Sequence, residues 1–189
     1  GQWSTDFTDR MALAAVGMIY GNLRIAYKNG KNLAAREQMA LAATCAGLAF
    51  TRANVGYVHA IAHQLGGKYH TPHGLANAIM LPQVLAFLSP SITRKLAILA
   101  VRAKVGKAGE RPAVLAKKFL ASVEALNRDL GIPQYLDALR EEDIPALAKA
   151  ACWEADTNYP VPRYMSPATC EKLLRQVLPP STTRRGRTG

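Results

Sequence analysis

Apolar residues recur at helical spacing along almost the whole of this 189-residue chain. No alternating run rich in Val, Ile or Thr lies between turn signals, as it would in a strand. Spacings of three and four residues are typical of one face of an amphipathic helix, and they predict an all-α fold. The clearest early stripe stops at the Asn-Gly pair of residues 29–30 and consists of Ala12, Val16, Ile19 and Leu23.

Capping residues and turn signals place the ends of the expected helices. Thr8 is the expected N-cap of the first helix, and Asn32 caps a second one that runs to about Phe50. This second helix is rich in alanine and apolar on several faces, which predicts a central helix packed on more than one side. A third is expected over residues 55–65, ending at the glycine pair that follows. The remaining helices are expected over residues 73–88, with a kink or break at Pro82, and over 91–105, 111–130, 144–155 and 167–178.

Length and composition favour one ordinary globular domain. Hydrophobic residues make up 49% and charged residues 20% of the chain, values that exclude wholesale disorder. We expect residues 1–178 to form a single helical domain. Residues 179–189, rich in Pro, Ser, Thr, Arg and Gly, are expected to form a disordered basic tail.

The formal net charge of the chain is +11. Such a surplus fits either a solvated basic surface or the binding of nucleic acid or an anionic membrane surface. Arg184, Arg185 and Arg187 of the tail account for part of it, and no nucleic-acid motif accompanies the rest, so a solvated surface is favoured and nucleic acid is not an expected partner. The alternative is a basic helical binding module whose histidines are structural or hold a non-catalytic metal, which predicts salt-sensitive binding.

The sequence gives no indication of a membrane or secreted protein. No stretch approaches the roughly 18 to 20 uncharged apolar residues of a membrane span, and the first ten residues lack the features of a signal peptide. The three cysteines are widely spaced without a CxxC pair, which indicates neither a disulfide framework nor a thiolate zinc site. We expect a cytoplasmic protein.

All four histidines lie within the segment VHAIAHQLGGKYHTPHG, which spans residues 58–74. His59 and His63 are four residues apart on an expected helix and therefore project from one face. The glycine pair lets the chain reverse and bring His73 back towards His59. Neutral imidazoles are good ligands for Zn²⁺ and Fe²⁺, so His59 and His73 are the stronger ligand candidates. His63 fits a ligand or a proton shuttle, whereas His70 fits a surface residue.

The longer segment GLAFTRANVGYVHAIAHQLGGKYHTPHGLANAIMLPQVL resembles the signature region of the iron-containing (group III, metal-dependent) alcohol dehydrogenases. Three elements occur in a fixed order: AGLAF, VHAxAHxLGG and TPHGxANAxxLP. GIPQYLDALREEDIPALAKAA and DTNYPVPRYMSPATCEKLL resemble flanking parts of the family's helical domain. The resemblance covers most of the chain apart from the tail and implies a multi-helix, dehydroquinate synthase-like helical domain.

By this resemblance, His59 and His73 take the positions of two metal-binding histidines. His63 takes that of a residue beside the nicotinamide and the substrate, with a proton-relay role. Phe50 falls where the family has a residue lining the substrate pocket, although a core aromatic would explain it equally well. The implied activity is hydride transfer between a small alcohol or aldehyde and NAD or NADP, with Fe²⁺ or Zn²⁺ as the metal. The histidine motifs favour this branch over the related glycerol dehydrogenases and dehydroquinate synthases.

The chain departs from the family pattern near its beginning. Family members have an amino-terminal α/β domain that binds the dinucleotide, and an aspartate and a further histidine on the first helix of the helical domain complete the metal shell. Neither feature is found in this sequence, where Asp9 instead fits the first turn of a helix. The resemblance therefore implies a carboxyl-terminal portion of such an enzyme that is catalytically incompetent alone. Its implied partners are the amino-terminal domain and further copies of the parent enzyme.

Overall fold

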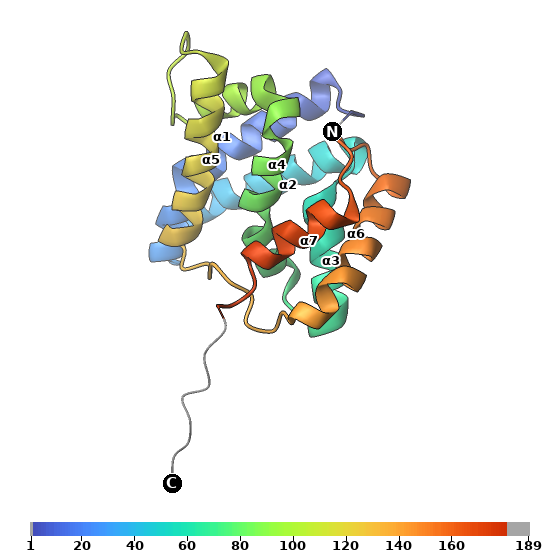
Figure 1. Ribbon diagram of the computed structural model, residues 1–189. Helices are drawn as coiled ribbons and strands as arrows, with labels where there is room; N and C mark the ends of the chain where they lie inside the picture. Colours follow the sequence, from blue (N-terminus) through green and yellow to red (C-terminus); the bar gives the residue numbers. More distant parts are fainter. Residues whose placement is uncertain (1, 181–189) are drawn as a thin grey trace.

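The computed structural model describes residues 2–180, and within this range the chain consists of helices and loops without a strand (Figure 1). The predicted all-α fold is confirmed. Of the tail expected at residues 179–189, residues 181–189 lie outside the described residues. The elements are, in chain order, α1 (Asp6–Lys28), α2 (Leu33–Ala53), α3 (Tyr57–Tyr69), α4 (His73–Arg102), α5 (Pro112–Asp129), the short 3₁₀ helix η1 (Glu141–Asp143), α6 (Ile144–Asn158) and α7 (Pro167–Gln176).

The fold has two hydrophobic cores, one on each side of α4. The larger one joins α3, α6, α7 and the first half of α4, where Leu65, Met80 and Leu174 are fully buried. The smaller one lies between the second half of α4 and α5, and side chains of α1 pack against its edge. In Figure 1, α6 and α7 accordingly lie on one side of α4, and α5 lies on the other. Helix α4 is therefore the common element of the fold.

Helix α4 is a single long element with one break. The backbone leaves the helical region at Ile92 (φ −129°, ψ 20°), two residues after Pro90. The break expected at Pro82 is not found, because the helix continues through that position, and Met80 and Val84 on either side of it in the sequence are buried. A proline inside a helix removes one hydrogen bond and crowds the preceding turn. Of the two prolines, Pro90 is the one that precedes a change of direction.

The length and composition of α4 are also those of a helix able to cross a membrane, a property that inspection of the sequence did not reveal. Within the described fold, its apolar side chains divide between two environments. Ile79 and Leu96 are buried in the cores, whereas Leu81 and Leu85 line a cavity. The apolar character of α4 thus corresponds to its central place among α3, α5 and α7.

Helix α2 is not the central helix that its alanine-rich sequence predicted. It packs mainly against α1, and its buried residues form a narrow stripe of small side chains at seven-residue spacing, Ala35, Ala42 and Ala49. Alanine counts as apolar on every face of a helix, so the pattern could not distinguish one packed face from several. The larger apolar side chains of α2 are exposed, and these are Leu33, Leu41, Leu48 and Phe50.

The first helix begins one turn earlier than expected. Thr5, rather than Thr8, is the N-cap of α1, and its hydroxyl oxygen accepts a hydrogen bond from the Thr8 backbone amide at 3.3 Å. In return the Thr8 hydroxyl oxygen accepts a bond from the Thr5 amide at 2.8 Å. The two residues form a capping box, which satisfies amides that the helix itself leaves without partners. Asp6 and Asp9 lie in this first turn, where negative charge is favourable.

The capping box leads to a stability prediction. Replacing Thr5 with alanine is expected to lower the free energy of unfolding by about 1 kcal/mol, because the Thr8 amide loses its acceptor. Thr44→Ala is the matched control, since the Thr44 hydroxyl bonds only to a carbonyl within α2. Chemical denaturation followed by circular dichroism compares the two variants. Equal stability of both variants and the unaltered chain would show that the cap contributes nothing.

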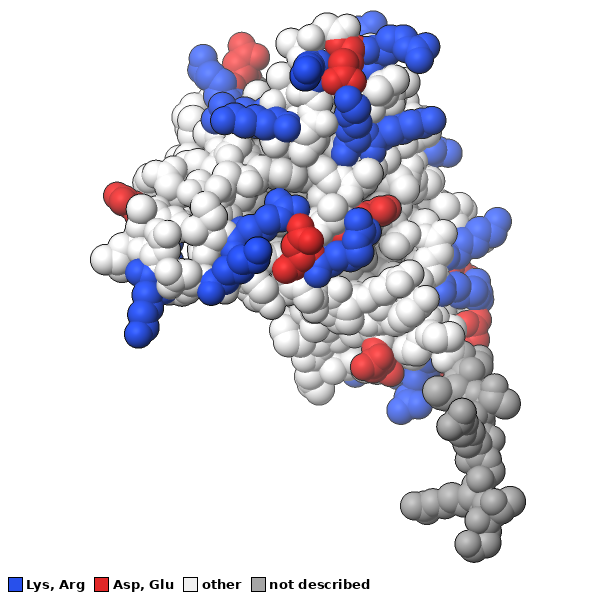
Figure 2. Space-filling model, turned by 90° about the vertical axis from the view of Figure 1, so that its left-hand side faces the viewer, with Lys and Arg blue, Asp and Glu red and all other residues white. Residues whose placement is uncertain are grey.

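Acidic and basic side chains are interspersed on the surface. On the face drawn in Figure 2, Asp and Glu side chains lie between Lys and Arg side chains, which do not merge into one continuous basic stripe. Ion pairs form between several side chains of the described residues, including Lys118 with Glu110 at 2.6 Å and Arg24 with Asp129 at 2.7 Å. This mixed pattern is typical of a solvated surface.

Candidate functional site

Three of the four histidines come together where α3 meets the start of α4. His59 and His63 lie one turn apart on α3, and His73 is the first residue of α4. The ring centroids are 5.3 Å apart for His59 and His73, and 5.4 Å apart for His63 and His73. The centroids of His59 and His63 are 6.1 Å apart. The short turn after α3 thus brings three imidazoles into one cluster, which we call the histidine cluster.

The backbone at the end of α3 makes this cluster possible. The helix continues through the glycine pair, where it was expected to end, and closes at His70 in the left-handed conformation (φ 54°). The amide of His70 donates to the Gly66 carbonyl oxygen at 2.9 Å, which completes the last turn. The side chain of His70 is exposed. The backbone of His70 therefore closes the last turn of α3, and its ring takes no part in the three close ring pairs of the cluster.

Hydrogen bonds near both ends of α3 fix the helix that carries His59 and His63. Near its start, the buried Tyr57 hydroxyl bonds to the Asp156 carboxylate of α6 and accepts a bond from the Met165 amide at 2.8 Å. At its end, the Tyr69 hydroxyl donates to Asp143 Oδ2 at 2.7 Å. Burial, followed by the bond to Asp156, raises the pKa of Tyr57, so this phenol remains protonated. Helix α3 is thereby tied to both ends of α6.

The environment of His59 favours its neutral form. Partial burial lowers the pKa of His59 below its ordinary value, and the neighbouring His73 and His63 lower it further. Burial disfavours a charged imidazole, and clustered rings cannot all be protonated without mutual repulsion. A neutral imidazole has a free nitrogen lone pair for a metal ion.

His73 is held by a side chain one turn further along α4. Asn77 Nδ2 lies 3.0 Å from His73 Nε2 and donates to the His73 backbone oxygen at 2.9 Å. Asn77 Oδ1 is buried and has no hydrogen-bond partner, so an unused acceptor lies beside the histidine cluster. If a metal ion binds His73 through Nε2, the Asn77 amide must give up its contact with that nitrogen. Asn77 is thus a hydrogen-bonding neighbour of a candidate ligand.

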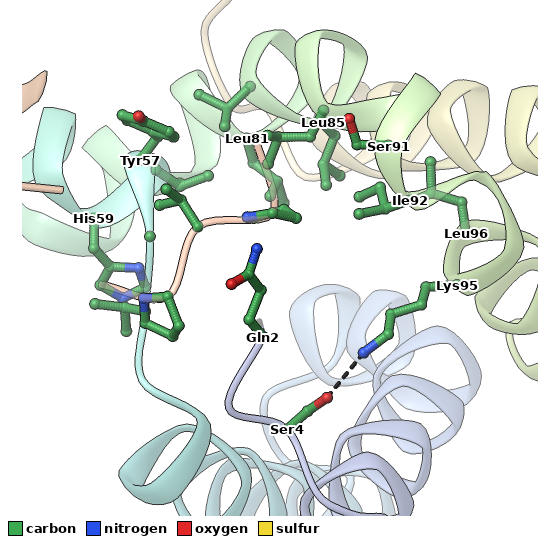
Figure 3. Close-up of a pocket in the computed structure, with 18 of the residues that line it drawn as sticks. Gln2, Ser4, Tyr57, His59, Leu81, Leu85, Ser91, Ile92, Lys95 and Leu96 are labelled. Carbon is green, nitrogen blue, oxygen red and sulfur yellow. Dashed lines mark hydrogen bonds between the residues drawn. The ribbon is translucent and has the colours of Figure 1, made fainter. Parts of the chain in front are cut away.

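A large cavity of about 1220 Å³ opens beside the histidine cluster (Figure 3). His59, His73 and Asn77 form part of its wall. At another part of the wall, the Lys95 ammonium donates to the Ser4 hydroxyl at 2.8 Å, as the dashed line in Figure 3 marks. Between these polar groups the lining is mainly apolar and includes Val58, Leu81, Val84, Leu85, Leu88, Ile92, Leu96 and Leu99. An apolar cavity with a few polar groups is typical of a small-molecule site.

Phe50 is not the core aromatic that one interpretation of the sequence predicted, whereas its place in a substrate pocket stays a prediction. It lies near the end of α2 with 52% of its surface exposed, and it is not among the residues that line the cavity. A core aromatic would be buried, so the exposure of Phe50 contradicts that interpretation alone. Within the described chain, Phe50 is part of the exposed apolar face of α2.

One residue of the site was not predicted from the sequence. The Glu154 carboxylate of α6 approaches the histidine cluster, and its Oε1 lies 2.7 Å from His63 Nδ1. In sequence Glu154 is 91 residues away from His63, and it lies in a helix whose spacing indicates only amphipathic packing. The contact depends on the packing of α6 against α3. No local signal in the sequence could have revealed it.

Across residues 2–180, no group of three or more His, Cys, Asp and Glu side chains is placed so as to hold a metal ion. Structural zinc sites use four protein ligands, and catalytic sites use three with one position left open. The chemistry of His59 and His73 fits a divalent metal, since both are imidazoles. Because two donors do not complete a shell, a metal held by these residues requires further ligands.

Known proteins resemble the chain in both sequence and fold. The model of the Fe-containing alcohol dehydrogenase family, C-terminal, matches residues 1–178. The 1,3-propanediol dehydrogenase of Klebsiella pneumoniae is 44% identical over 76% of this chain and 38% of its own length. The 1-propanol dehydrogenase PduQ of Citrobacter freundii is 33% identical over 93% of this chain and 49% of its own length.

Solved structures give the same result for the fold. A crystal structure of 1,3-propanediol oxidoreductase superposes with a TM-score of 0.88 at 39% identity, covering 94% of this chain and 47% of that one. An alcohol dehydrogenase from Oenococcus oeni gives a TM-score of 0.86 at 32% identity, covering 93% and 46% respectively. The chain spans about half the length of the relatives it matches. With a family model matched over residues 1–178 and an architecture shared with solved relatives, the chain belongs to the iron-containing alcohol dehydrogenase family, to the carboxyl-terminal helical part of it.

Proposed function

We propose that this chain forms the metal- and substrate-binding part of a metal-dependent alcohol dehydrogenase, which transfers a hydride between a small alcohol or aldehyde and NAD(P). The observation that carries the proposal is the histidine cluster, of which His59 and His73 lie at the wall of a mainly apolar cavity. The names of the relatives, among them 1,3-propanediol dehydrogenase and lactaldehyde reductase, support small alcohols and aldehydes as the substrate class.

In this proposal, His59 and His73 hold a divalent metal ion, and Fe²⁺ or Zn²⁺ suits their imidazole nitrogens. When bound, the ion supplies Lewis-acid polarisation of the substrate oxygen. His63, stacked on His73, accepts or returns the hydroxyl proton through its imidazole ring. The apolar wall formed by side chains such as Leu81 and Leu85 binds the carbon skeleton of a small substrate and excludes water.

The proposal assigns dinucleotide binding to a separate α/β domain, because residues 2–180 contain no strand to build a nucleotide-binding sheet. The greater length of the relatives supports this assignment.

Helix α2 exposes large apolar side chains, which a neighbouring domain or a second copy would cover. A cytoplasmic location also belongs to the proposal, since free cysteines such as the buried Cys152 and Cys170 suit a reducing compartment. The mixed charge on the face drawn in Figure 2 supports this function over a basic binding module.

A domain exchange tests the proposed function. The chain alone, supplied with Fe²⁺ or Zn²⁺, NAD(P)⁺ and a panel of small alcohols, is expected to give no turnover. Fusing residues 1–178 to the amino-terminal half of the Klebsiella pneumoniae 1,3-propanediol dehydrogenase, in place of its own carboxyl-terminal part, is expected to give metal-dependent alcohol oxidation, followed by NADH absorbance.

The same exchange with His63→Asn is the internal comparison, and its turnover is expected to fall about 100-fold through loss of the proton acceptor. A folded, metal-loaded fusion that oxidises none of the alcohols would contradict the proposed function. Full turnover of the His63→Asn fusion would remove His63 from the mechanism and leave the metal site in place. Turnover by the chain alone would contradict the separate dinucleotide domain.

A further inference from the structure

The Glu154 carboxylate is the one acidic group hydrogen-bonded to the histidine cluster among the described residues. Its Oε1 lies 2.7 Å from Nδ1 of His63, and the two side chains come from different helices, α6 and α3. The Glu154 side chain is 19% exposed, so water has limited access to it. A hydrogen bond between an imidazole nitrogen and a carboxylate is stronger than one between neutral groups.

Glu154 is itself held in place by two further donors. Gln64 Nε2 donates to Oε2 at 2.8 Å, and the Tyr159 hydroxyl donates to Oε1 at 2.7 Å. Burial, followed by the bond to Glu154, raises the pKa of Tyr159 to about 12, so the phenol keeps its proton and acts as a donor. Both carboxylate oxygens therefore accept bonds from fixed groups, and the carboxylate cannot turn away from His63 without losing them.

An ionised carboxylate accepts hydrogen bonds and cannot donate them, so the proton in the contact with His63 resides on Nδ1. The neutral imidazole then carries its lone pair on Nε2, at the opposite side of the ring. The bond also fixes the plane of the ring, which stacks on His73 at an interplanar angle of 18°. Second partners of this kind select the tautomer and the orientation of functional histidines.

We propose that Glu154 is a positioning residue that holds His63 as the Nδ1–H tautomer and presents Nε2 as the proton-accepting atom. The catalytic meaning of this role rests on the proposed function, in which His63 handles the hydroxyl proton. The tautomer itself is a property of the chain that can be measured without turnover. Tyr159 and Gln64 act on His63 only through Glu154.

Nitrogen NMR of the imidazoles tests the inference on the complete 189-residue chain. With only four histidines, the spectra of ¹⁵N-histidine-labelled protein can be assigned by single replacements, and each tautomer has a distinct pair of nitrogen shifts. His63 is expected in the Nδ1–H form. In Glu154→Ala, the ratio of the Nδ1–H to the Nε2–H form is expected to fall about tenfold, because the acceptor is lost. Glu154→Gln, whose amide oxygen still accepts, is expected to restore most of it.

Glu124→Ala, which removes an exposed glutamate of α5, is the matched control and is expected to leave the His63 signals unchanged. Should Glu154→Ala not fold, as judged by circular dichroism, Glu154→Gln and Tyr159→Phe in the same measurement decide the matter. A His63 found as the Nε2–H form, or one indifferent to a folded Glu154→Ala, would overturn the proposal. An inactive fusion enzyme would count against the proposed function only, since this readout needs no activity.

Discussion

Replacing His59 with alanine is expected to lower the affinity of the chain for Zn²⁺ or Fe²⁺ roughly 100-fold or more, beyond the ~10- to 100-fold that loss of an outer-shell partner costs. His59 supplies one of the two imidazoles proposed as ligands, and its ring lies 5.3 Å from that of His73. A single remaining imidazole would hold the ion about as weakly as a surface histidine does. Calorimetric titration with Zn²⁺ measures the change directly.

His70→Ala is the matched control for this prediction, because it removes the same type of side chain from the same segment. Its ring is exposed, and it takes no part in the three close ring pairs. The control is expected to bind Zn²⁺ as the unaltered chain does. If His59→Ala retains full affinity, or if both variants lose affinity equally, His59 is not a ligand.

Leu65→Ala is expected to produce the largest loss of stability among simple truncations, about 2 to 5 kcal/mol in the free energy of unfolding. Leu65 is fully buried on α3 in the larger core, where α3, α4, α6 and α7 meet. The truncation removes apolar contacts and leaves a cavity that these tightly packed helices cannot close. Denaturant unfolding followed by circular dichroism measures the difference.

Leu33→Ala gives the comparison for the same chemical change at the surface. Leu33 begins α2 and is 79% exposed, so its truncation is expected to alter stability by at most about 0.5 kcal/mol. Similar losses for the two variants would mean that Leu65 contributes no more than an exposed leucine, and that the larger core is not the main source of stability.

The helices and the histidine cluster could be predicted from the sequence, because both depend on local spacing. The four-residue step between His59 and His63 places them on one face of any helix. The turn after α3 then returns the chain over only a few residues to His73. The ends of the helices were harder to predict from the sequence. Glycines inside α3 and the proline at position 82 are tolerated where tertiary contacts hold the backbone.

The sequence could not predict which helices and side chains pack against one another. Glu154 meets His63 because α6 packs on α3, and nothing near either residue specifies that contact. The interpretation of Phe50 as a core aromatic and the predicted central place of α2 illustrate the opposite error. The apolar character of Phe50 and of α2 indicated burial, but the described chain leaves Phe50 and the large leucines of α2 on the surface. The hydrophobicity of a side chain indicates a preference for burial, but it does not identify the surface against which the side chain packs.

Helix α4 contributes to both hydrophobic cores, and this has a consequence for how the domain loses its structure. The larger core uses its first half and the smaller core its second half. Detaching α5 would expose the second half of α4, and loosening α3 or α7 would expose the first. Because both cores are built on α4, the loss of that helix would remove part of each core. His73 is the first residue of α4, at the end of the helix that belongs to the larger core, so the histidine cluster depends on the packing of α3, α6 and α7 around that end.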